Sequence, residues 1–384
     1  MSQIRKIAAQ WVLTSNGLLP RAIVCINNSG VIEDIVCCDN IDRQSGVEFY
    51  NGILIPDMVN AHSHLELSYL RGAIASGEGF AGFAQAIGRV RNNFVEGERE
   101  RSALFWDAKM FAEGVGAVGD ISNGTSTVGV KSSSKIYYHT FAELFGLSTQ
   151  DLGPISGAVA GFKAANLPVS TTPHSVYSLN KKAFNLAVNA NAQSTLSIHF
   201  MESDAESELF SQRGHLWQWY SRSQMNVDFL DELSPVGRII NNIPSSRKVL
   251  LVHCSKITDL DITRLVDHFG DNLSCVVCPR SNKYIEGSTV DIEVLRRSGC
   301  RIVVGTDSLA STDNLSMIDQ IKEFEGVPLE ERLGWITING AQALGLENRL
   351  GVIAKGARSG LVLVSGVDFE SMTLRKDAFA QRII

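Results

Sequence analysis

The sequence predicts an α/β fold, namely a (β/α)₈ TIM-type barrel with a small β-sandwich domain built from both chain ends. Two observations carry this prediction. From Ile53 onward, short apolar runs alternate with helical stretches, which is the pattern of repeated strand–helix units around a parallel sheet. The two chain ends instead hold β-rich runs bounded by turn residues. We therefore expect a barrel over residues 53–349 and a small β domain from residues 1–52 plus 350–384.

The elements follow in chain order. A small antiparallel sheet is expected from Trp11–Thr14, Ala22–Ile26 and Val31–Val36. The barrel strands are expected at Ile53–Ala61, Ala117–Ile121, Ile136–Ala142, Pro168–Thr172, Thr195–Phe200, Lys248–His253, Leu273–Cys278 and Arg301–Gly305. Helices between them include Ser102–Glu113, Lys181–Asn191, Asp259–His268 after a Thr258 cap, and Ile292–Arg297 before a Gly299 stop. The tail runs Gly351–Ile353 and Leu361–Val364 are expected to join the N-terminal sheet.

Composition and charge exclude several classes of protein. The 384 residues are 44% apolar and 20% charged, which is ordinary globular composition and argues against a disordered or collagen-like chain. The net charge of −6, without a long run of one sign, argues against a nucleic-acid partner. No apolar stretch approaches the roughly 20 residues that cross a bilayer, and no leader peptide is recognisable. Seven cysteines in a chain of this size indicate reduced thiols and a cytoplasmic protein. A homo-oligomer is compatible with the sequence.

The strongest local motif is His62-Ser-His64 at the end of the first expected barrel strand. Residues two apart on a strand point the same way, so both imidazoles can face one metal ion. Alone, the motif fits two surface histidines equally well. Its position is informative, because active sites of this fold lie at the carboxyl ends of the strands.

Titratable residues follow three further expected strands. His199 lies at the end of the fifth with Glu202 just after it, His253 ends the sixth, and Asp307 follows the eighth. A strand-end histidine often caps a carbonyl and an aspartate before serine often caps a turn, so each residue has a structural alternative. Together they favour a shared metal site.

With these residues in place, the sequence resembles the amidohydrolase superfamily, and within it the mononuclear deaminases and chlorohydrolases. The resemblance covers essentially the whole chain and includes Cys278-Pro-Arg-Ser-Asn282 and Gly305-Thr-Asp-Ser-Leu-Ala310. It implies one divalent metal held by four residues: His62, His64, His199 and Asp307. It also implies that Glu202 is the proton shuttle and that His253 lies beside the hydrolytic water. One departure is Arg358-Ser359, where the family has a small-acidic pair before the closing strand.

The expected number of metal ions follows from a lysine that the fourth strand lacks. Binuclear members need a lysine at the end of the fourth strand, and this sequence has none between Leu167 and Tyr177. Three imidazoles and a carboxylate suit zinc, with ferrous iron as the alternative. Such a cation lowers the pKa of bound water toward about 7. Asp307 and His253 would orient that water, and Glu202 would carry its proton to a ring nitrogen and then to the leaving amine.

Residues on the same rim are candidates for binding a small-molecule substrate. They follow predicted strands: Glu66, His174, Tyr177, Arg280 and Asn282. A guanidinium at Arg280 suggests an anionic group on the substrate. The His64-Leu-Glu66-Leu-Ser and Cys278-Pro-Arg-Ser-Asn282 segments are similar to those of aminodeoxyfutalosine deaminases of the alternative menaquinone pathway, whose substrate joins an adenine nucleoside to a benzoate. Deaminases of cytosine, guanine, thioadenosine and homocysteine-adenosine share the same core.

Two other functions stay open at this point. The same hydroxide could cleave a carbon–chlorine or amide bond, and a catalytically silent homologue could serve as a binding module. Cys275 and Cys278 have the spacing of a zinc knuckle, but they lie in an apolar strand and indicate core packing. Gly77–Gly82 is interpreted as a mobile loop. The aromatic residues Trp217, Trp219 and Tyr220 are interpreted as part of a helix packed on the barrel, in preference to a lid over the substrate.

Overall fold

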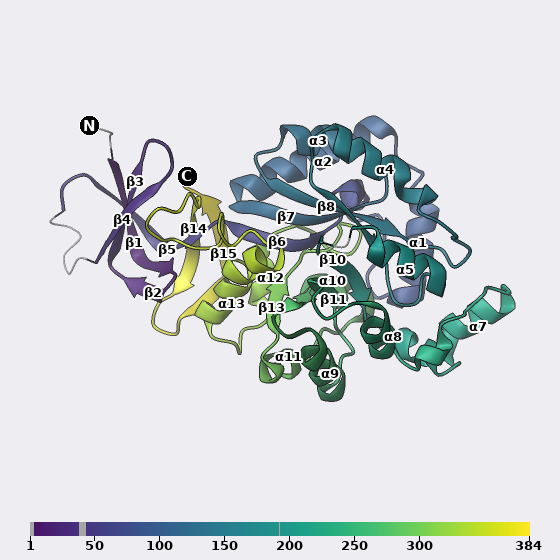
Figure 1. Ribbon diagram of the computed structural model, residues 1–384. Helices are drawn as coiled ribbons and strands as arrows, with labels where there is room; N and C mark the ends of the chain where they lie inside the picture. Colours follow the sequence, from purple (N-terminus) through teal and green to yellow (C-terminus); the bar gives the residue numbers. More distant parts are fainter. Residues whose placement is uncertain (1–3, 38–43, 192) are drawn as a thin grey trace.

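The computed structural model describes residues 4–37, 44–191 and 193–384. Two groups of strands make up the molecule (Figure 1): parallel strands surrounded by helices, and a separate sheet of strands from both chain ends. Helix α7 lies at the opposite end of the molecule from this terminal sheet. The two groups therefore meet along one side, and the strand–helix part carries most of the chain.

Eight parallel strands form the strand–helix part. They are β6 (Met58–Ser63), β7 (Val115–Ser122), β8 (Tyr137–Leu144), β9 (Val169–Pro173), β10 (Leu196–Phe200), β11 (Val249–His253), β12 (Leu273–Val277) and β13 (Arg301–Val304). They pair as two four-stranded sheets, in the orders β6-β7-β8-β9 and β10-β11-β12-β13. Isolated bridges join Ser63 to Asp307 and Ser175 to His199, at the two edges where these sheets meet. This is an α/β architecture of the TIM-barrel type, in which the strands end on one common rim.

Helices connect and cover these strands. The α-helices are α1 (Gly79–Val90), α2 (Glu96–Ala112), α3 (Val128–Ser133), α4 (Gly153–Ala164), α5 (Lys181–Asn189), α6 (Asp204–Phe210), α7 (Gly214–Arg222), α8 (Pro235–Asn242), α9 (Asp259–Phe269), α10 (Pro279–Glu286), α11 (Ile292–Ser298), α12 (Met317–Lys322), α13 (Leu329–Trp335) and α14 (Ile338–Ala343). Short 3-10 helices are η2 (Leu65–Leu70), η3 (Leu230–Glu232) and η4 (Gly270–Asn272). None of the helices formed by the described residues is both long and apolar enough to cross a membrane.

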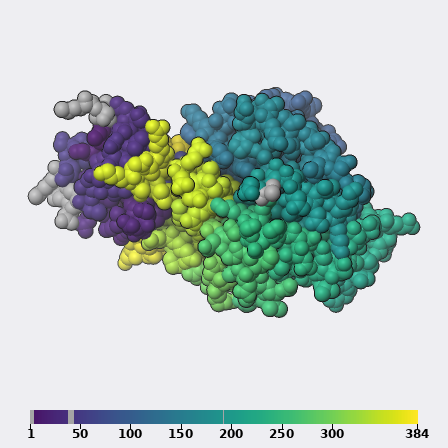
Figure 2. All heavy atoms as spheres, in the orientation of Figure 1, coloured from purple at the N-terminus to yellow at the C-terminus, as the bar shows by residue number. Residues whose placement is uncertain are grey.

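The terminal sheet has seven strands. They are β1 (Ile4–Thr14), β2 (Gly17–Pro20), β3 (Ala22–Asn27), β4 (Ile32–Cys37), β5 (Val47–Pro56), β14 (Leu361–Asp368) and β15 (Thr373–Arg382). Their order is β15-β14-β5-β1-β3-β4, with β2 on β1. The prediction that both chain ends share one sheet is confirmed, and Figure 2 shows the C-terminal residues lying against the N-terminal ones. The sheet is mixed instead of antiparallel, because β1 and β5 run parallel.

The first expected barrel strand, Ile53–Ala61, is in fact two strands. Residues of β5 pair with β14 in the terminal sheet, and β6 starts after Asp57. The Asp57 carboxylate is buried and lies 2.6 Å from the Arg382 guanidinium, while its backbone N–H donates to the Ser359 hydroxyl at 3.2 Å. These contacts fix the turn from one sheet to the other. Ser359, one of the two residues that depart from the family pattern, acts at this join and not on the rim.

Some other elements differ from the sequence prediction, and two predicted helix ends agree with it. Strand β15 was missed because three successive exposed charged residues, Arg375 to Asp377, interrupt its alternation of buried and exposed positions; among the described residues it pairs with β14 at the sheet edge. Gly351–Ile353 contributes only an isolated bridge to Thr14. The expected loop Gly77–Gly82 already contains the start of α1 at Gly79. The Thr258 cap of α9 and the Gly299 stop of α11 are confirmed.

Candidate active site

Three of the predicted ligands form one cluster of imidazoles. His62 and His64 lie on and just after β6, and their Nε2 atoms are 3.1 Å apart. His199, on β10, lies with its ring centroid 4.9 Å from that of His62. One nitrogen of each residue falls within 4.8 Å of the other two. The strand geometry expected from His-x-His therefore places both rings on the same side, facing the ring from β10.

Asp307 completes this cluster from the end of β13. Its Oδ1 lies 3.3 Å from His64 Nε2 and 3.6 Å from His62 Nε2. Its Oδ2 accepts hydrogen bonds from the hydroxyls of Ser281 and Ser311, at 2.5 and 3.0 Å. A φ of +58° turns the chain at Asp307, an uncommon conformation of the kind found at functional sites. The aspartate thus has one oxygen fixed by serines and the other aimed at the imidazoles.

The donor set fits a divalent cation. Burial lowers the pKa of His62 and of His64 to about 4, so both rings are neutral at pH 7 and carry free lone pairs. Two such nitrogens 3.1 Å apart, beside a carboxylate oxygen, are arranged to share a positive charge. Burial would raise the pKa of Asp307, but its hydrogen bond with His62 and the nearby histidines hold it well below the usual range. Strand β9 carries no lysine that could bridge a second metal.

Glu202 and His253 lie beside the cluster on the same rim. Glu202 Oε1 is 3.6 Å from His253 Nε2, and both side chains are buried. Burial raises the pKa of Glu202 to about 8, so its carboxyl can both hold and release a proton near neutral pH. The amide of Asn282 contacts His253 Nδ1 at 3.1 Å and orients the ring. Asn282, expected to bind substrate, instead serves as a partner of His253.

A buried carboxylate missed by the sequence analysis fixes the Glu202 segment. Glu206 accepts the backbone N–H of Met201 at 2.9 Å and that of Glu202 at 2.8 Å. Its side chain is fully buried, and this burial raises its pKa to about 8. Because both oxygens bind consecutive amides, Glu206 determines where the Glu202 side chain starts. Only its place four residues after Glu202, in the first turn of α6, could have suggested this role.

A second missed carboxylate lies behind the cluster. Glu143, at the end of β8, is 3.0 Å from His199 Nδ1. Burial would raise the pKa of Glu143, but His174 and His199 hold it below its usual range. Burial would likewise lower the pKa of His199, but Glu143 raises it to about 9. Glu143, His174 and His199 form a second group with metal-ligand geometry, and this group shares His199 with the first.

A buried ion pair supports the start of η2 beside His64. Lys131 Nζ lies 2.7 Å from Asp120 Oδ2, and both side chains are fully buried. Asp120 Oδ1 accepts the backbone N–H of Leu65 at 2.8 Å. The pair therefore anchors the residue that follows His64. Neither residue belongs to a recognisable motif, so the pair could not be expected from the sequence.

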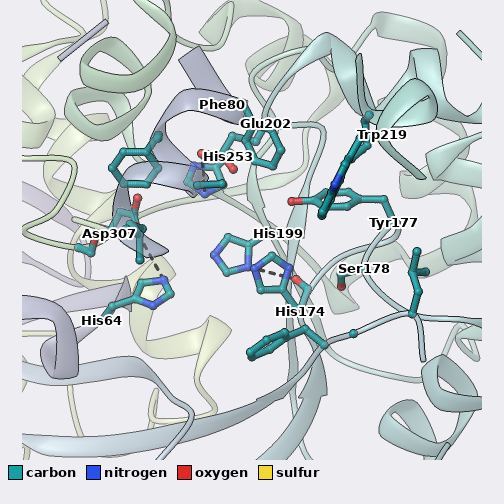
Figure 3. A pocket seen from close by; sticks show the side chains of 18 of the residues that line it. His64, Phe80, His174, Tyr177, Ser178, His199, Glu202, Trp219, His253 and Asp307 are labelled. Atoms are coloured by element: carbon teal, nitrogen blue, oxygen red, sulfur yellow. Dashed lines mark hydrogen bonds and ion pairs between the residues drawn. The ribbon is translucent and has the colours of Figure 1, made fainter. Parts of the chain in front are cut away.

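The cluster opens into a cavity of about 430 Å³. His174 and Tyr177 line it, as expected, and Figure 3 shows the Tyr177 hydroxyl pointing toward the imidazoles. Phe80 and Trp219 form part of its apolar wall. Tyr220 packs in the interior and donates to the Tyr177 carbonyl at 3.3 Å, which fits the interpretation of α7 as a packed helix. Trp219 and Tyr220 nevertheless both line the cavity, so α7 also forms part of its wall.

Two other predicted substrate residues do not line this cavity. The Arg280 guanidinium lies 2.5 Å from Asp313 and 3.6 Å from Glu323, and it faces a separate surface hollow. Because α10 starts at Pro279, its first turn carries Arg280 outward from the rim, and the prediction that it faces the metal cluster is wrong. Glu66 instead accepts the backbone N–H of Asn123 at 3.1 Å, and burial raises its pKa to about 7.

A TIM-type set of parallel strands with imidazoles and carboxylates at the strand ends defines a metal-dependent hydrolase. A family model described as "Amidohydrolase family" matches residues 53–381, so the chain belongs to the amidohydrolase family. The resemblance noted in the sequence is thereby confirmed.

Relatives and solved structures agree with this assignment. The chain is 28% identical over 318 residues to an adenosine deaminase of Helicobacter pylori, covering 78% of this chain and 76% of that protein. It is 23% identical over 390 residues to a 5-methylthioadenosine/S-adenosylhomocysteine deaminase of Dictyoglomus turgidum, covering 92% and 83%. The crystal structure of Helicobacter pylori aminofutalosine deaminase with methylthio-coformycin superposes with a TM-score of 0.80 at 25% identity, covering 94% of this chain and 92% of that one.

Proposed function

We propose that this protein is a metal-dependent hydrolytic deaminase that acts on a 6-aminopurine nucleoside and releases ammonia. One observation carries the proposal: the buried Glu202 carboxyl, with its raised pKa, faces the same cavity as the imidazole cluster. A proton carrier is needed when water replaces an amine, and it is not needed for binding alone. The deaminase names of the relatives support the same reaction.

The proposed metal site holds one divalent cation through four residues: His62, His64, His199 and Asp307. Zinc is the proposed ion and iron the alternative, since three imidazoles and a carboxylate suit both. A similar fold was solved "with bound zn" for an adenosine deaminase of Xanthomonas campestris, at a TM-score of 0.73 and 19% identity. When bound, the cation lowers the pKa of water and supplies hydroxide near pH 7.

The protein's own residues then orient the water and the substrate and transfer the protons. Asp307 Oδ1 and the His253 ring orient the attacking water toward the amidine carbon of the purine. Glu202 accepts one proton of the attacking water and passes it to the ring nitrogen. It then takes the second proton of that water and delivers it to the amine, which leaves as ammonia when the carbonyl forms. His174 and Tyr177 are proposed to contact the substrate, because both line the cavity. Burial of these groups excludes bulk water and strengthens their electrostatic effect.

The cavities support an extended nucleoside. Phe80 and Trp219 line both the 430 Å³ cavity and a larger one of about 890 Å³ next to it, so a group attached to the ribose can reach the second space. The proposed substrate class therefore includes 6-amino-6-deoxyfutalosine and 5′-thio-substituted adenosines. Among the described residues, no lysine or arginine lines either cavity, so a benzoate carboxylate would not meet a cationic side chain there.

A substrate panel tests the function. Zinc-loaded protein is given adenosine, 5′-methylthioadenosine, S-adenosylhomocysteine and 6-amino-6-deoxyfutalosine, and ammonia release is measured together with the shift in purine absorbance. The proposal expects kcat/KM of at least about 10⁴ M⁻¹s⁻¹ for one of them. Chloride release from a chlorinated triazine, without ammonia release from any purine, would instead establish the dechlorinating alternative. No turnover of either class by metal-loaded protein would identify a silent homologue.

The proposal also covers how the two sheets close and where in the cell the enzyme acts. The two four-stranded parallel sheets are proposed to close as one (β/α)₈ barrel from β6 onward, over residues 58–349, through the bridges at their edges. The remaining residues would form a small sandwich-like domain. Six free cysteines among the described residues fit a cytoplasmic location, while Cys38 lies outside those residues.

A further inference from the structure

We propose that Glu143 is a positioning residue that fixes the tautomer and ring orientation of His199, so that Nε2 of His199 is the atom presented to the metal. The inference deepens the proposed function, because it assumes the metal site described above. No motif in the sequence marks Glu143, and it does not line the substrate cavity. Its role follows from what surrounds His199.

Two acceptors surround His199 Nδ1. The backbone carbonyl oxygen of His174 accepts a hydrogen bond from it at 3.1 Å, and the Glu143 carboxylate oxygen Oε1, which is buried and has no hydrogen-bond partner of its own, lies 3.0 Å from it as an ion-pair neighbour. A nitrogen between two acceptors must carry the hydrogen, since a lone pair there would face two others. Nδ1 of His199 therefore carries a hydrogen, and once the ring is neutral, as a metal ligand must be, its lone pair is on Nε2.

The ring of His199 cannot easily turn away from this arrangement. His174 stacks on one side with centroids 4.6 Å apart and planes at 23°, and His253 stacks with centroids 5.4 Å apart and planes at 27°. His62 meets the ring edge-on at 84°. With Glu143 at the Nδ1 edge, Nε2 is left for the group formed with His62 and His64.

Glu143 is also suited to this role by its environment. Its side chain is 2% exposed, and His199 is its sole ion-pair partner among the described residues. A carboxylate that accepts the far N–H of a metal-bound histidine orients the ring and raises its basicity as a ligand, and removing such a partner typically weakens metal binding 10- to 100-fold. A merely structural role would change folding stability and leave metal affinity alone.

The first test measures zinc affinity by chelator competition in three variants. Glu143→Gln keeps the shape but removes the charge, and we expect a 10- to 100-fold higher dissociation constant with an unchanged melting temperature of the metal-free protein. Glu143→Asp should recover part of the affinity. Glu100→Gln, an exposed change on α2, is the control and should bind zinc as tightly as the unmodified protein. A Glu143→Gln dissociation constant within twofold of the unmodified value would overturn the inference.

The second test checks the tautomer itself in the unmodified protein, and Glu143→Asp serves as the variant if Glu143→Gln does not fold. ¹⁵N NMR of the histidines in the zinc-loaded protein should show His199 protonated at Nδ1 and metal-bound at Nε2. Zinc on Nδ1, or an unprotonated Nδ1, would overturn the inference. Neither readout uses turnover, so failure to deaminate any purine would reject the proposed function alone, whereas failure of the unmodified protein to bind zinc would reject both.

Discussion

Replacing Glu202 by glutamine tests the proton-transfer step directly. The change is nearly isosteric and leaves the backbone N–H of residue 202 free to donate to Glu206. Glu202 is not part of the imidazole group, so metal binding should be retained. The amide can neither accept the water proton nor deliver it to the purine. We therefore expect a variant that folds and binds metal but turns over very slowly.

The magnitude follows from the role. A positioned general acid–base contributes about 10²- to 10⁴-fold, and Glu202 serves in more than one transfer, so the upper part of this range applies. At 1.36 kcal/mol per tenfold change, the loss is about 4 to 5.5 kcal/mol of transition-state stabilisation. The effect should fall on kcat more than on KM, because the interaction is made during proton transfer.

The assay combines ammonia release with elemental analysis on the same preparation. Glu100→Gln, a surface change on α2, is the matched control and should behave as the unmodified protein. If Glu202→Gln keeps its metal and retains more than about one tenth of the kcat, Glu202 is not the shuttle. A variant that has lost its metal would show that Glu202 supports the metal site instead.

The remaining predictions concern the metal, the pH profile and two side chains. Chelator treatment should abolish turnover and lower the melting temperature, since a ligand at 100 times its dissociation constant stabilises by about 2.7 kcal/mol; an unchanged melting temperature would count against the site. Burial raises the pKa of Glu202 from 4.5 to about 8 and a bound cation lowers it again, so kcat/KM should fall on acidification with a midpoint between these values; a flat profile from pH 8 to 5 would contradict this. Glu206→Gln should lower kcat about 10- to 100-fold by misplacing Glu202, and metal-bound protein with full kcat would refute that role. Arg280→Met should change kcat/KM for adenosine and for 6-amino-6-deoxyfutalosine alike, because Arg280 is paired with Asp313 outside the cavity; a selective loss for the carboxylate-bearing substrate would restore it as a clamp.

Much of the fold could be predicted because the buried strands have a clear local pattern in the sequence. Seven of the eight expected barrel strands match a single observed strand, since buried parallel strands are short apolar runs. Ile53–Ala61 could not be divided from the sequence, because both β5 and β6 are apolar there. The break depends on Asp57 meeting Arg382, a contact between residues at opposite ends of the chain.

Some residues of the candidate site could likewise be predicted from the sequence, and others could not. His62, His64, His199 and Asp307 could be expected together because a parallel barrel brings strand ends to one rim, whatever their separation in sequence. Arg280 also follows a strand, but the first turn of α10 directs its side chain outward. That direction depends on how the helix is turned about its own axis, which a short motif does not reveal. The buried carboxylates Glu143, Glu206 and Asp120 could not be found from the sequence because their partners, a histidine, backbone amides and a lysine, form no recognisable motif with them.

Metal reconstitution tests the central claim most directly. Chelator-treated protein is titrated with zinc, and ammonia release from the best 6-aminopurine nucleoside is followed against equivalents of zinc per chain. The account predicts no activity without metal, a linear rise, and a plateau at one equivalent. Activity that needs no metal, or that keeps rising to two equivalents, would contradict a deaminase built on a single ion held by His62, His64, His199 and Asp307.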